Sequence, residues 1–496
     1  MRNRLVVTAT TACALGLAVM PAAAQSVTTY HNGVQRHGAY VVAGLTAASA
    51  GSMHLDAAFN ASANGAIYAQ PLYWHPAGAA VGSVIVASET NQVQALNAHT
   101  GAPVWQTQLP AAARLSALGC GNIDPEGITG TPAIDPASGT IYLDAVTDVA
   151  PSGVRHLIYA LSAATGAVLP NWPLDVQAAV TAQGVAFDST IQGERGALLL
   201  TGGNLYVTYG GRSGDCGSYH GTVIELGPNG PPKVTGIWTT HATGGGIWAQ
   251  GGIASDGVSL FSTTGNTFGA NGWSDGEAII RLRSGLAHSN SVNDYFTPAN
   301  WQQLDNTDLD LGGTEALPLA VPNATGQPTP RVIAFGKDGN AYVADRTRLG
   351  GIGGQVAMAQ VSNSEIITSP AVYNTASAAM VVFRNGAGRN CSGSSVSMLD
   401  ITESAMPIKE VWCAPLSGSG APIMTTSNGT ADPLVWIAGA EGDNLLHGYN
   451  AMTGAAVFTG GSQPMSGLHH FVTILAANHH LYVGADNRVY GFTFTP

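Results

Sequence analysis

The chain has 496 residues, of which only 10% are charged, and its formal net charge is −12. It shows no basic patch, so nucleic acid is not expected as a partner. It also has no zinc-type cysteine spacing and no C-x-x-C-H motif for haem attachment. Glycine is abundant, at 64 residues, and the apolar runs are short. This composition favours an all-β chain of many short strands joined by tight turns.

The first segment, residues 1–24, has the features of a secretion signal. Arg2 and Arg4 precede the apolar run LVVTATTACALGLAVM, and AAA at 22–24 supplies small residues for cleavage before Gln25. No later run reaches the length of a transmembrane segment. We therefore expect a soluble, exported protein, located in the periplasm, at the cell surface or outside the cell.

Four cysteines remain beyond this signal, and an even number in an exported chain indicates two disulfides. Four cysteines allow three pairings. The short separation favours Cys391 with Cys413, and elimination then leaves Cys120 with Cys216.

The low density of charge has two explanations. A protein with few ion pairs to lose and few cations to repel one another tolerates strong acid. An Ala/Gly-rich composition from a GC-rich genome explains the same numbers equally well.

Two internal repeats organise the rest of the chain. ALNAHTGAPVW (95–105) recurs as ALSAATGAVLPNW (160–172) and as GYNAMTGAAVF (448–458). Each copy follows a β-rich run, which predicts a strand, a Thr-Gly turn and a second strand. The Trp or Phe after the turn is expected to pack against a neighbouring unit.

The second repeat consists of eight short strand-like segments spaced along the chain. They are 67–74, 128–135, 191–199, 247–255, 313–320, 366–373, 421–427 and 468–475. Eight units of about four strands predict a single eight-bladed β-propeller over 25–496, with these segments as the innermost strands. Two stacked sandwiches would not explain eight similar starts. The last unit is short, so an N-terminal strand from about 27–45 is expected to close the ring.

The A-L-[NS]-A-x-T-G-x-x-x-W motif resembles the quinoprotein-like β-propellers, which include quinone-dependent alcohol dehydrogenases and an outer-membrane assembly propeller. The segments GDCGSYHG (214–221), GGIWAQGG (245–252), DYFTPANWQQLDNTDLDLGG (294–313) and GKDGNAYVADRTRLGG (336–351) mark a narrower secreted subgroup. That subgroup is similar to the tetrathionate hydrolases of acidophilic sulfur oxidisers. The resemblance implies an exported enzyme that cleaves a polythionate in the propeller funnel.

The candidate site residues lie on or near the predicted innermost strands. The substrate-binding candidates are Gln70, Arg195, Trp248, Gln250, Glu315, Lys337, His469 and His470. Strand alternation points about half of them away from the funnel. For any one of them a structural hydrogen bond is at least as good an account, and a lysine at a hairpin end explains Lys337.

The chain gathers carboxylates just before the fifth innermost strand, between Asp294 and Glu315. Capping of loops by Asp side chains explains them in structural terms, and a calcium loop ranks third because the spacing differs from an EF-hand. The functional interpretation makes Asp310 or Asp308 the general base, since a carboxylate still accepts protons near pH 3, where histidine cannot. Arg195, Lys337, Trp248 or protonated His469 would then hold the sulfonate ends.

Two other functions remain open. One is a pyrroloquinoline quinone (PQQ)-dependent alcohol or sugar dehydrogenase with calcium, although the adjacent Cys-Cys pair of many members is missing. The other is a non-catalytic binding or scaffolding propeller at the cell envelope. Tetrathionate hydrolysis needs a small anionic substrate and no cofactor or metal. The oligomeric state is left open, a homodimer included.

Overall fold

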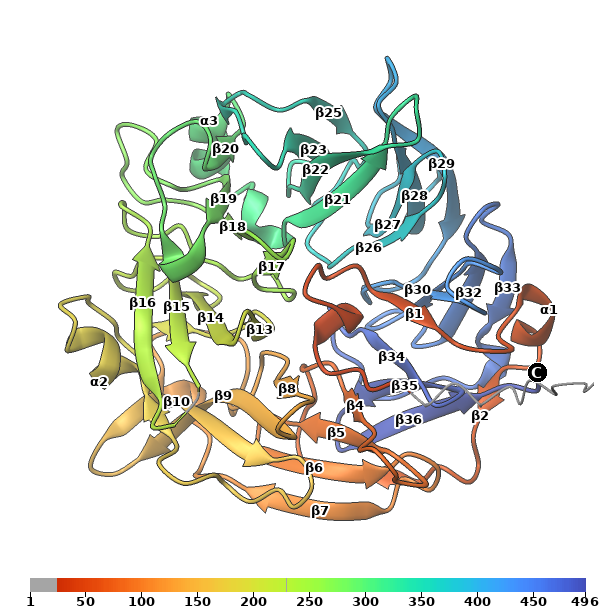
Figure 1. Cartoon of the computed structure of the whole chain (residues 1–496), viewed down its shortest axis with the longest axis horizontal. Coiled ribbons are helices and arrows are strands. Elements are labelled where there is room, and N and C mark those ends of the chain that lie inside the picture. Colours follow the sequence, from red (N-terminus) through yellow and green to blue (C-terminus); the bar gives the residue numbers. More distant parts are fainter. Residues whose placement is uncertain (1–24, 229) are drawn as a thin grey trace, which may run out of the picture.

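The computed structural model describes residues 25–228 and 230–496, so the predicted signal, 1–24, lies outside the described residues. Its strands form eight separate sheets of four or five strands. The sheets stand radially around one axis (Figure 1). This confirms the predicted all-β, eight-bladed propeller.

Each predicted innermost segment contains the start of an innermost strand. These strands are β4 (Leu72–Trp74), β8 (Ala133–Asp135), β12 (Gln192–Gly193) with β13 (Leu199–Thr201), β17 (Ala254–Ser255), β21 (Leu317–Pro322), β26 (Ala371–Asn374), β30 (Ile423–Thr426) and β34 (Ile474–Ala477). The second strands are β5 (Ser83–Ala87), β9 (Thr140–Val149), β14 (Asn204–Gly211), β18 (Leu260–Thr264), β22 (Pro328–Phe335), β27 (Ala379–Asn385), β31 (Leu434–Ala438) and β35 (His480–Ala485).

Successive strands from the first to the fourth pair antiparallel in each blade, as in the first blade. The third strands are β6 (Gln92–Asn97), β10 (Gly153–Ser162), β15 (Thr222–Gly227), β19 (Ala278–Leu282), β23 (Asn340–Asp345), β28 (Ser395–Ile401), β32 (Leu446–Asn450) and β36 (Arg488–Thr493). The outermost strands of blades one to seven are β7 (Pro103–Gln108), β11 (Leu174–Asp175), β16 (Lys233–Thr239), β20 (Tyr295–Thr297) with β24 (Gly351–Ile352), β25 (Ala357–Gln360), β29 (Ile408–Pro415) and β33 (Ala456–Thr459).

Helices are few and short among the described residues. The α-helices are α1 (Ala47–Ala50), α2 (Val176–Thr181) and α3 (Trp301–Thr307). The 3₁₀ helices are η1 (Tyr30–Asn32), η2 (Leu115–Ala117), η3 (Ser284–Leu286), η4 (Leu311–Gly313) and η5 (Gly460–Ser462). None of these helices is long and apolar enough to cross a membrane.

The Thr-Gly turns dock neighbouring blades as the repeat predicts. Trp105 of the first blade donates from Nε1 to the carbonyl of Ala163 in the second, at 2.9 Å. Its ring lies against Gly166, whose φ is 72° and whose position would not admit a Cβ. Gly454 receives Trp412 in the same way between blades six and seven. Glycine is needed at both turns because the backbone is left-handed and the indole fills the side-chain space.

The N-terminal part of the chain closes the ring, but with strands that lie later than residues 27–45. The eighth sheet is completed by β2 (His54–Leu55) and β3 (Ala61–Ser62), which both pair with β36. Within 27–45, only β1 (Ala39–Val41) is a strand. It pairs in parallel with β30 of the seventh blade. Most of residues 27–45 lie at the axis of the propeller instead.

Residues 27–42, here called the axial plug, cross the centre of the ring (Figure 1). The plug hydrogen-bonds all eight blades in turn, through Tyr73, Ile134, Ala197 with Leu198, Ile253, Pro318, Val372, Met424 and Thr473. Arg36 is fully buried and donates to three of these carbonyls, those of Ala197, Leu198 and Ile253. Arg36 therefore has a structural role at the centre of the ring.

Candidate functional site

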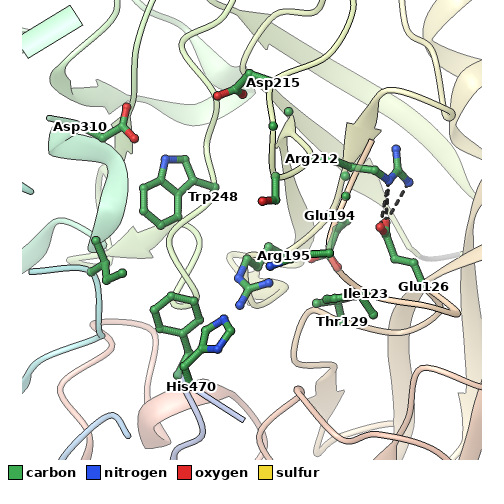
Figure 2. A pocket seen from close by; sticks show the side chains of 18 of the residues that line it. Ile123, Glu126, Thr129, Glu194, Arg195, Arg212, Asp215, Trp248, Asp310 and His470 are labelled. Carbon is green, nitrogen blue, oxygen red and sulfur yellow. Dashed lines mark hydrogen bonds and ion pairs between the residues drawn. The ribbon is translucent and has the colours of Figure 1, made fainter. Parts of the chain in front are cut away.

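A cavity of about 360 Å³ lies on the propeller axis, and its wall combines segments that precede innermost strands with the loops that follow β14 and β22. Six of the predicted site residues line it: Arg195, Trp248, Asp308, Asp310, Lys337 and His470. Figure 2 shows Arg195, Trp248 and His470 pointing into one space, with Asp310 beyond the indole. The proposed roles of these residues in catalysis and substrate binding stay predictions.

Lys337 joins the two aspartates that the sequence suggests as bases. Its Nζ lies 2.6 Å from Asp310 Oδ2 and 3.0 Å from Asp308 Oδ1. Burial lowers the pKa of Lys337, but the two carboxylates outweigh this effect and raise it to about 12. Burial raises the pKa of Asp310, against the opposing effect of Lys337. The buried Asp310 is thus a carboxylate held beside a cation at the cavity wall.

Trp248 forms an aromatic wall next to this pair. The Nζ of Lys337 lies 5.4 Å from the centre of its ring. The indole rests against Gly265 and Gly313, where an added Cβ would come within 3.2 Å and 3.1 Å. The ring is only partly covered, so an aromatic surface faces the cavity.

Arg212 and Glu126 form a second ion pair in the cavity wall. The Nε of Arg212 donates to Glu126 Oε2 at 2.9 Å, and its Nη1 donates to the carbonyls of Ser189 and Gln192. The hydrogen bonds of Arg212 therefore stabilise the cavity wall. The disulfide Cys120–Cys216 fastens the same two loops. Both this disulfide and Cys391–Cys413 pair as predicted.

Arg195 is held differently. Its guanidinium carbon lies 4.7 Å from the ring centre of Phe471 and 5.8 Å from that of Tyr68. Within residues 25–228 and 230–496 this guanidinium makes no hydrogen bond or ion pair, although burial lowers its pKa and three glutamates lie nearby. An arginine keeps its charge in proteins, so the cavity wall carries a cation that no described carboxylate contacts directly.

Two of those glutamates, Glu89 and Glu194, are buried behind and within the wall. Each accepts a backbone N–H through Oε2, from Gly127 at 2.6 Å and Gly130 at 3.1 Å. Their Oε1 atoms are buried without a partner among the described residues. Burial raises the pKa of Glu89 to about 8 and that of Glu194 well above its ordinary value. Glu89 therefore keeps its proton at neutral pH.

The other four predicted binding residues lie away from the cavity wall. Gln70 accepts from the backbone of His31 in the axial plug at 2.9 Å. Gln250 and Glu315 meet at Ser369, and burial raises the pKa of Glu315 to about 7. His469 bonds Asp486 at 2.7 Å and stacks on Tyr68, so it supports Tyr68 beneath Arg195.

The acidic segment between 294 and 315 divides by structural role. Asp294 is fully buried between Arg281 and Arg283, at 2.7 Å and 2.8 Å. Asp305 accepts from the backbone and hydroxyl of Thr267. Only Asp308 and Asp310 reach the cavity.

The wall residues that were not among the predicted candidates include Glu126, Glu194, Arg212, Asp215 and Phe471. Glu194 and Phe471 stand directly beside Arg195 and His470 in sequence, and Asp215 lies in the GDCGSYHG segment. Adjacency could have found these three. Nothing local links Glu126 to Arg212, because 86 residues separate them.

No family model and no curated protein matches this sequence. Solved structures do. The quinohemoprotein alcohol dehydrogenase of Comamonas testosteroni is 14% identical with a TM-score of 0.66, over 94% of this chain and 80% of that one. The alcohol dehydrogenase ADHIIG of Pseudomonas putida HK5 is 13% identical with a TM-score of 0.67 and the same coverage. A europium-containing methanol dehydrogenase is 15% identical with a TM-score of 0.64, over 94% and 98%.

The chain has the quinoprotein-like propeller fold. At 13% to 15% identity the likeness concerns the fold and not the activity. The two disulfides of this quinoprotein-like propeller are compatible with an exported protein.

Proposed function

We propose that this quinoprotein-like propeller is an exported oxidoreductase that binds a planar quinone of the PQQ class in the axial cavity and oxidises a small hydroxylated substrate. One observation carries the proposal. The Trp248 indole faces the cavity directly beside the Asp310–Lys337 ion pair. A planar cofactor stacked on the indole would therefore have a base and a cation at its edge.

The donor set fits such a group. PQQ is flat and carries carboxylates, which suit an indole face and the cations Lys337 and Arg195. When bound, the quinone would supply the two-electron acceptor that turns an alcohol into a carbonyl, and an external acceptor would reoxidise it. Asp310 would take the hydroxyl proton of the substrate, while Lys337 offsets the negative charge that Asp310 carries before that transfer.

The site also differs from what the resemblance to quinone-dependent dehydrogenases implies, in its disulfide and, within the part of the chain that the structure describes, in its lack of a metal-ligand cluster. The wall disulfide joins Cys120 to Cys216 and not two adjacent cysteines. The described residues contain no group of three His, Cys, Asp or Glu side chains arranged around a metal position. Asp308 and Asp310 share the ammonium group of Lys337. Calcium at these carboxylates would have to displace that group, so calcium is treated as a variable in the test.

The experiment uses protein purified from a host that makes no PQQ. PQQ is added with and without Ca²⁺, and dye reduction is followed with alcohols, sugars and hydroxy acids. Quinone binding is measured separately by quenching of tryptophan fluorescence. Trp248→Leu should abolish the binding, whereas Trp273→Leu should not, because Trp273 stacks on Tyr295 outside the cavity wall. Wild-type protein that takes up no quinone under either condition would contradict the proposal.

Tetrathionate hydrolysis is a second candidate. It is favoured by two cations, Arg195 and Lys337, on the wall of one cavity, since tetrathionate carries a sulfonate at each end. Tetrathionate consumption at about pH 3, near the ordinary pKa of Asp, tests it. Full activity in both Asp308→Asn and Asp310→Asn would exclude these residues as the base. A protein inactive in both assays would favour the binding or scaffolding function.

A further inference from the structure

The wall of the axial cavity holds an arginine whose guanidinium no described carboxylate contacts. The other wall cations, Arg212 and Lys337, are each bound to carboxylates at 3.0 Å or less. Arg195 has only the rings of Tyr68 and Phe471. A guanidinium presents five N–H donors in a planar fork, so an unpaired one inside a cavity lacks several hydrogen bonds.

The nearby glutamates do not fill this role. Glu126 is engaged by Arg212 through Nε and Nη2. Glu89 and Glu194 each point Oε2 at a backbone N–H of the wall. The charges of the three glutamates act on Arg195 only from a distance, since none of them contacts its guanidinium.

The aromatic clamp around Arg195 is built at a conformational cost. Phe471 has φ 70°, in the left-handed region that bulky side chains rarely adopt. Its backbone N–H is fixed by the carbonyl of Ser419 at 3.0 Å. Tyr68 is braced from behind, since its ring stacks on His469 at 4.4 Å and His469 bonds Asp486. Strain of this kind persists where the surroundings hold it, and it concentrates at ligand sites.

We infer that Arg195 is the receptor for a carboxylate in the axial cavity. The rings of Phe471 and Tyr68 fix the plane of the guanidinium, which leaves its fork free for bidentate binding. Figure 2 shows the side chain reaching toward the middle of the cavity, beside His470. The carboxylate belongs either to the substrate or to the quinone. If it belongs to the substrate, and given the proposed function, the substrate class is a hydroxy acid and not a neutral alcohol.

The test compares lactate with 1,2-propanediol, in which a hydroxymethyl group replaces the carboxylate. Calorimetric titration of the full-length, quinone-free protein should show lactate binding about tenfold to hundredfold more tightly, as expected for charge-assisted hydrogen bonds. Arg195→Gln should lose this preference. Arg195→Lys should keep part of it, because the charge remains without the fork.

Arg488→Gln is the matched control. Arg488 also lies over an aromatic ring, 4.4 Å from the centre of Tyr490, but outside the cavity wall. It should bind lactate as the wild type does, and melting curves should show all variants folded. An equal affinity of the wild type for lactate and propanediol, or an undiminished preference in Arg195→Gln, would overturn the inference.

A PQQ titration with lactate present identifies the source of the carboxylate. Displacement of lactate by PQQ would mean that Arg195 receives the quinone, and simultaneous binding would mean that it receives the substrate. Both results support a carboxylate receptor. Arg195-dependent lactate binding without any quinone-linked dye reduction would remove the proposed oxidation and leave this site in place.

Discussion

Replacement of Glu89 by glutamine should change how the stability of the propeller depends on pH. Glu89 is 1% exposed, and one of its two carboxylate oxygens has no partner among the described residues. Burial raises its pKa from 4.5 to about 8. Because the pKa is raised in the folded state, the stabilising contribution of the proton is fully present below pH 4.5 and is lost as the pH rises through 8.

The difference between 4.5 and about 8 corresponds to about 5 kcal/mol, at 1.36 kcal/mol for each pH unit. Relaxation around an ionised Glu89 lowers this limit, so we expect about 2–5 kcal/mol. Urea unfolding between pH 4 and 9 measures it. Wild type should lose this amount relative to Glu89→Gln between pH 4.5 and 8, and the variant should be the more stable above pH 8.

Glu365→Gln serves as the matched control, since Glu365 lies at the exposed edge of the same cavity. Its stability curve should run parallel to that of the wild type. A constant difference between wild type and Glu89→Gln from pH 4.5 to 8 would refute the argument, because Glu89 would then titrate alike in the folded and unfolded chains.

Three further changes test other parts of the structure. Lys337→Met should destabilise the fold by about 3 kcal/mol, because it leaves Asp310 unpaired. Adding Asp310→Asn should restore most of this stability, and additive effects of the two changes in urea unfolding would argue against coupling between Lys337 and Asp310. Cys216→Ser should cost about 2–4 kcal/mol and weaken ligand binding in the cavity; unchanged binding by calorimetry would show that the wall does not need Cys120–Cys216. Arg36→Met should lower stability by about 3–5 kcal/mol in the same unfolding assay, and a smaller loss than 1 kcal/mol would show that the plug bonds matter little.

The ring of blades could be predicted because its determinants are local and repeated. A Thr-Gly turn followed by Trp specifies both a hairpin and a docking contact, as Trp105 on Gly166 shows. The segment before each innermost strand points at the axis by construction. For this reason Asp310 could be expected near the funnel, whereas Lys337 lies in the turn between β22 and β23, and the 2.6 Å contact between the two appears only in the structure.

The remaining features depend on contacts between distant parts of the chain. Gln70 and Arg195 occupy similar places in their repeats, yet one bonds the axial plug and the other enters the cavity. The repeat pattern alone does not predict which of these side chains the axial plug covers and which one faces the cavity. The pairing of Arg212 with Glu126 and the burial of Glu89 Oε1 without a hydrogen-bond partner likewise arise only when blades meet.

The axial plug has a consequence for how the molecule is made. Residues 27–42 leave the ribosome before any of the blades that they bond, yet their partners include Met424 and Thr473, the latter 442 residues beyond His31. The buried charge of Arg36 has these carbonyl partners only when blades three and four stand beside it. The segment therefore has all of its bonding partners only after the eighth blade has been synthesised. Closure of the ring then brings β2 and β3 against β36 and encloses the plug at the centre.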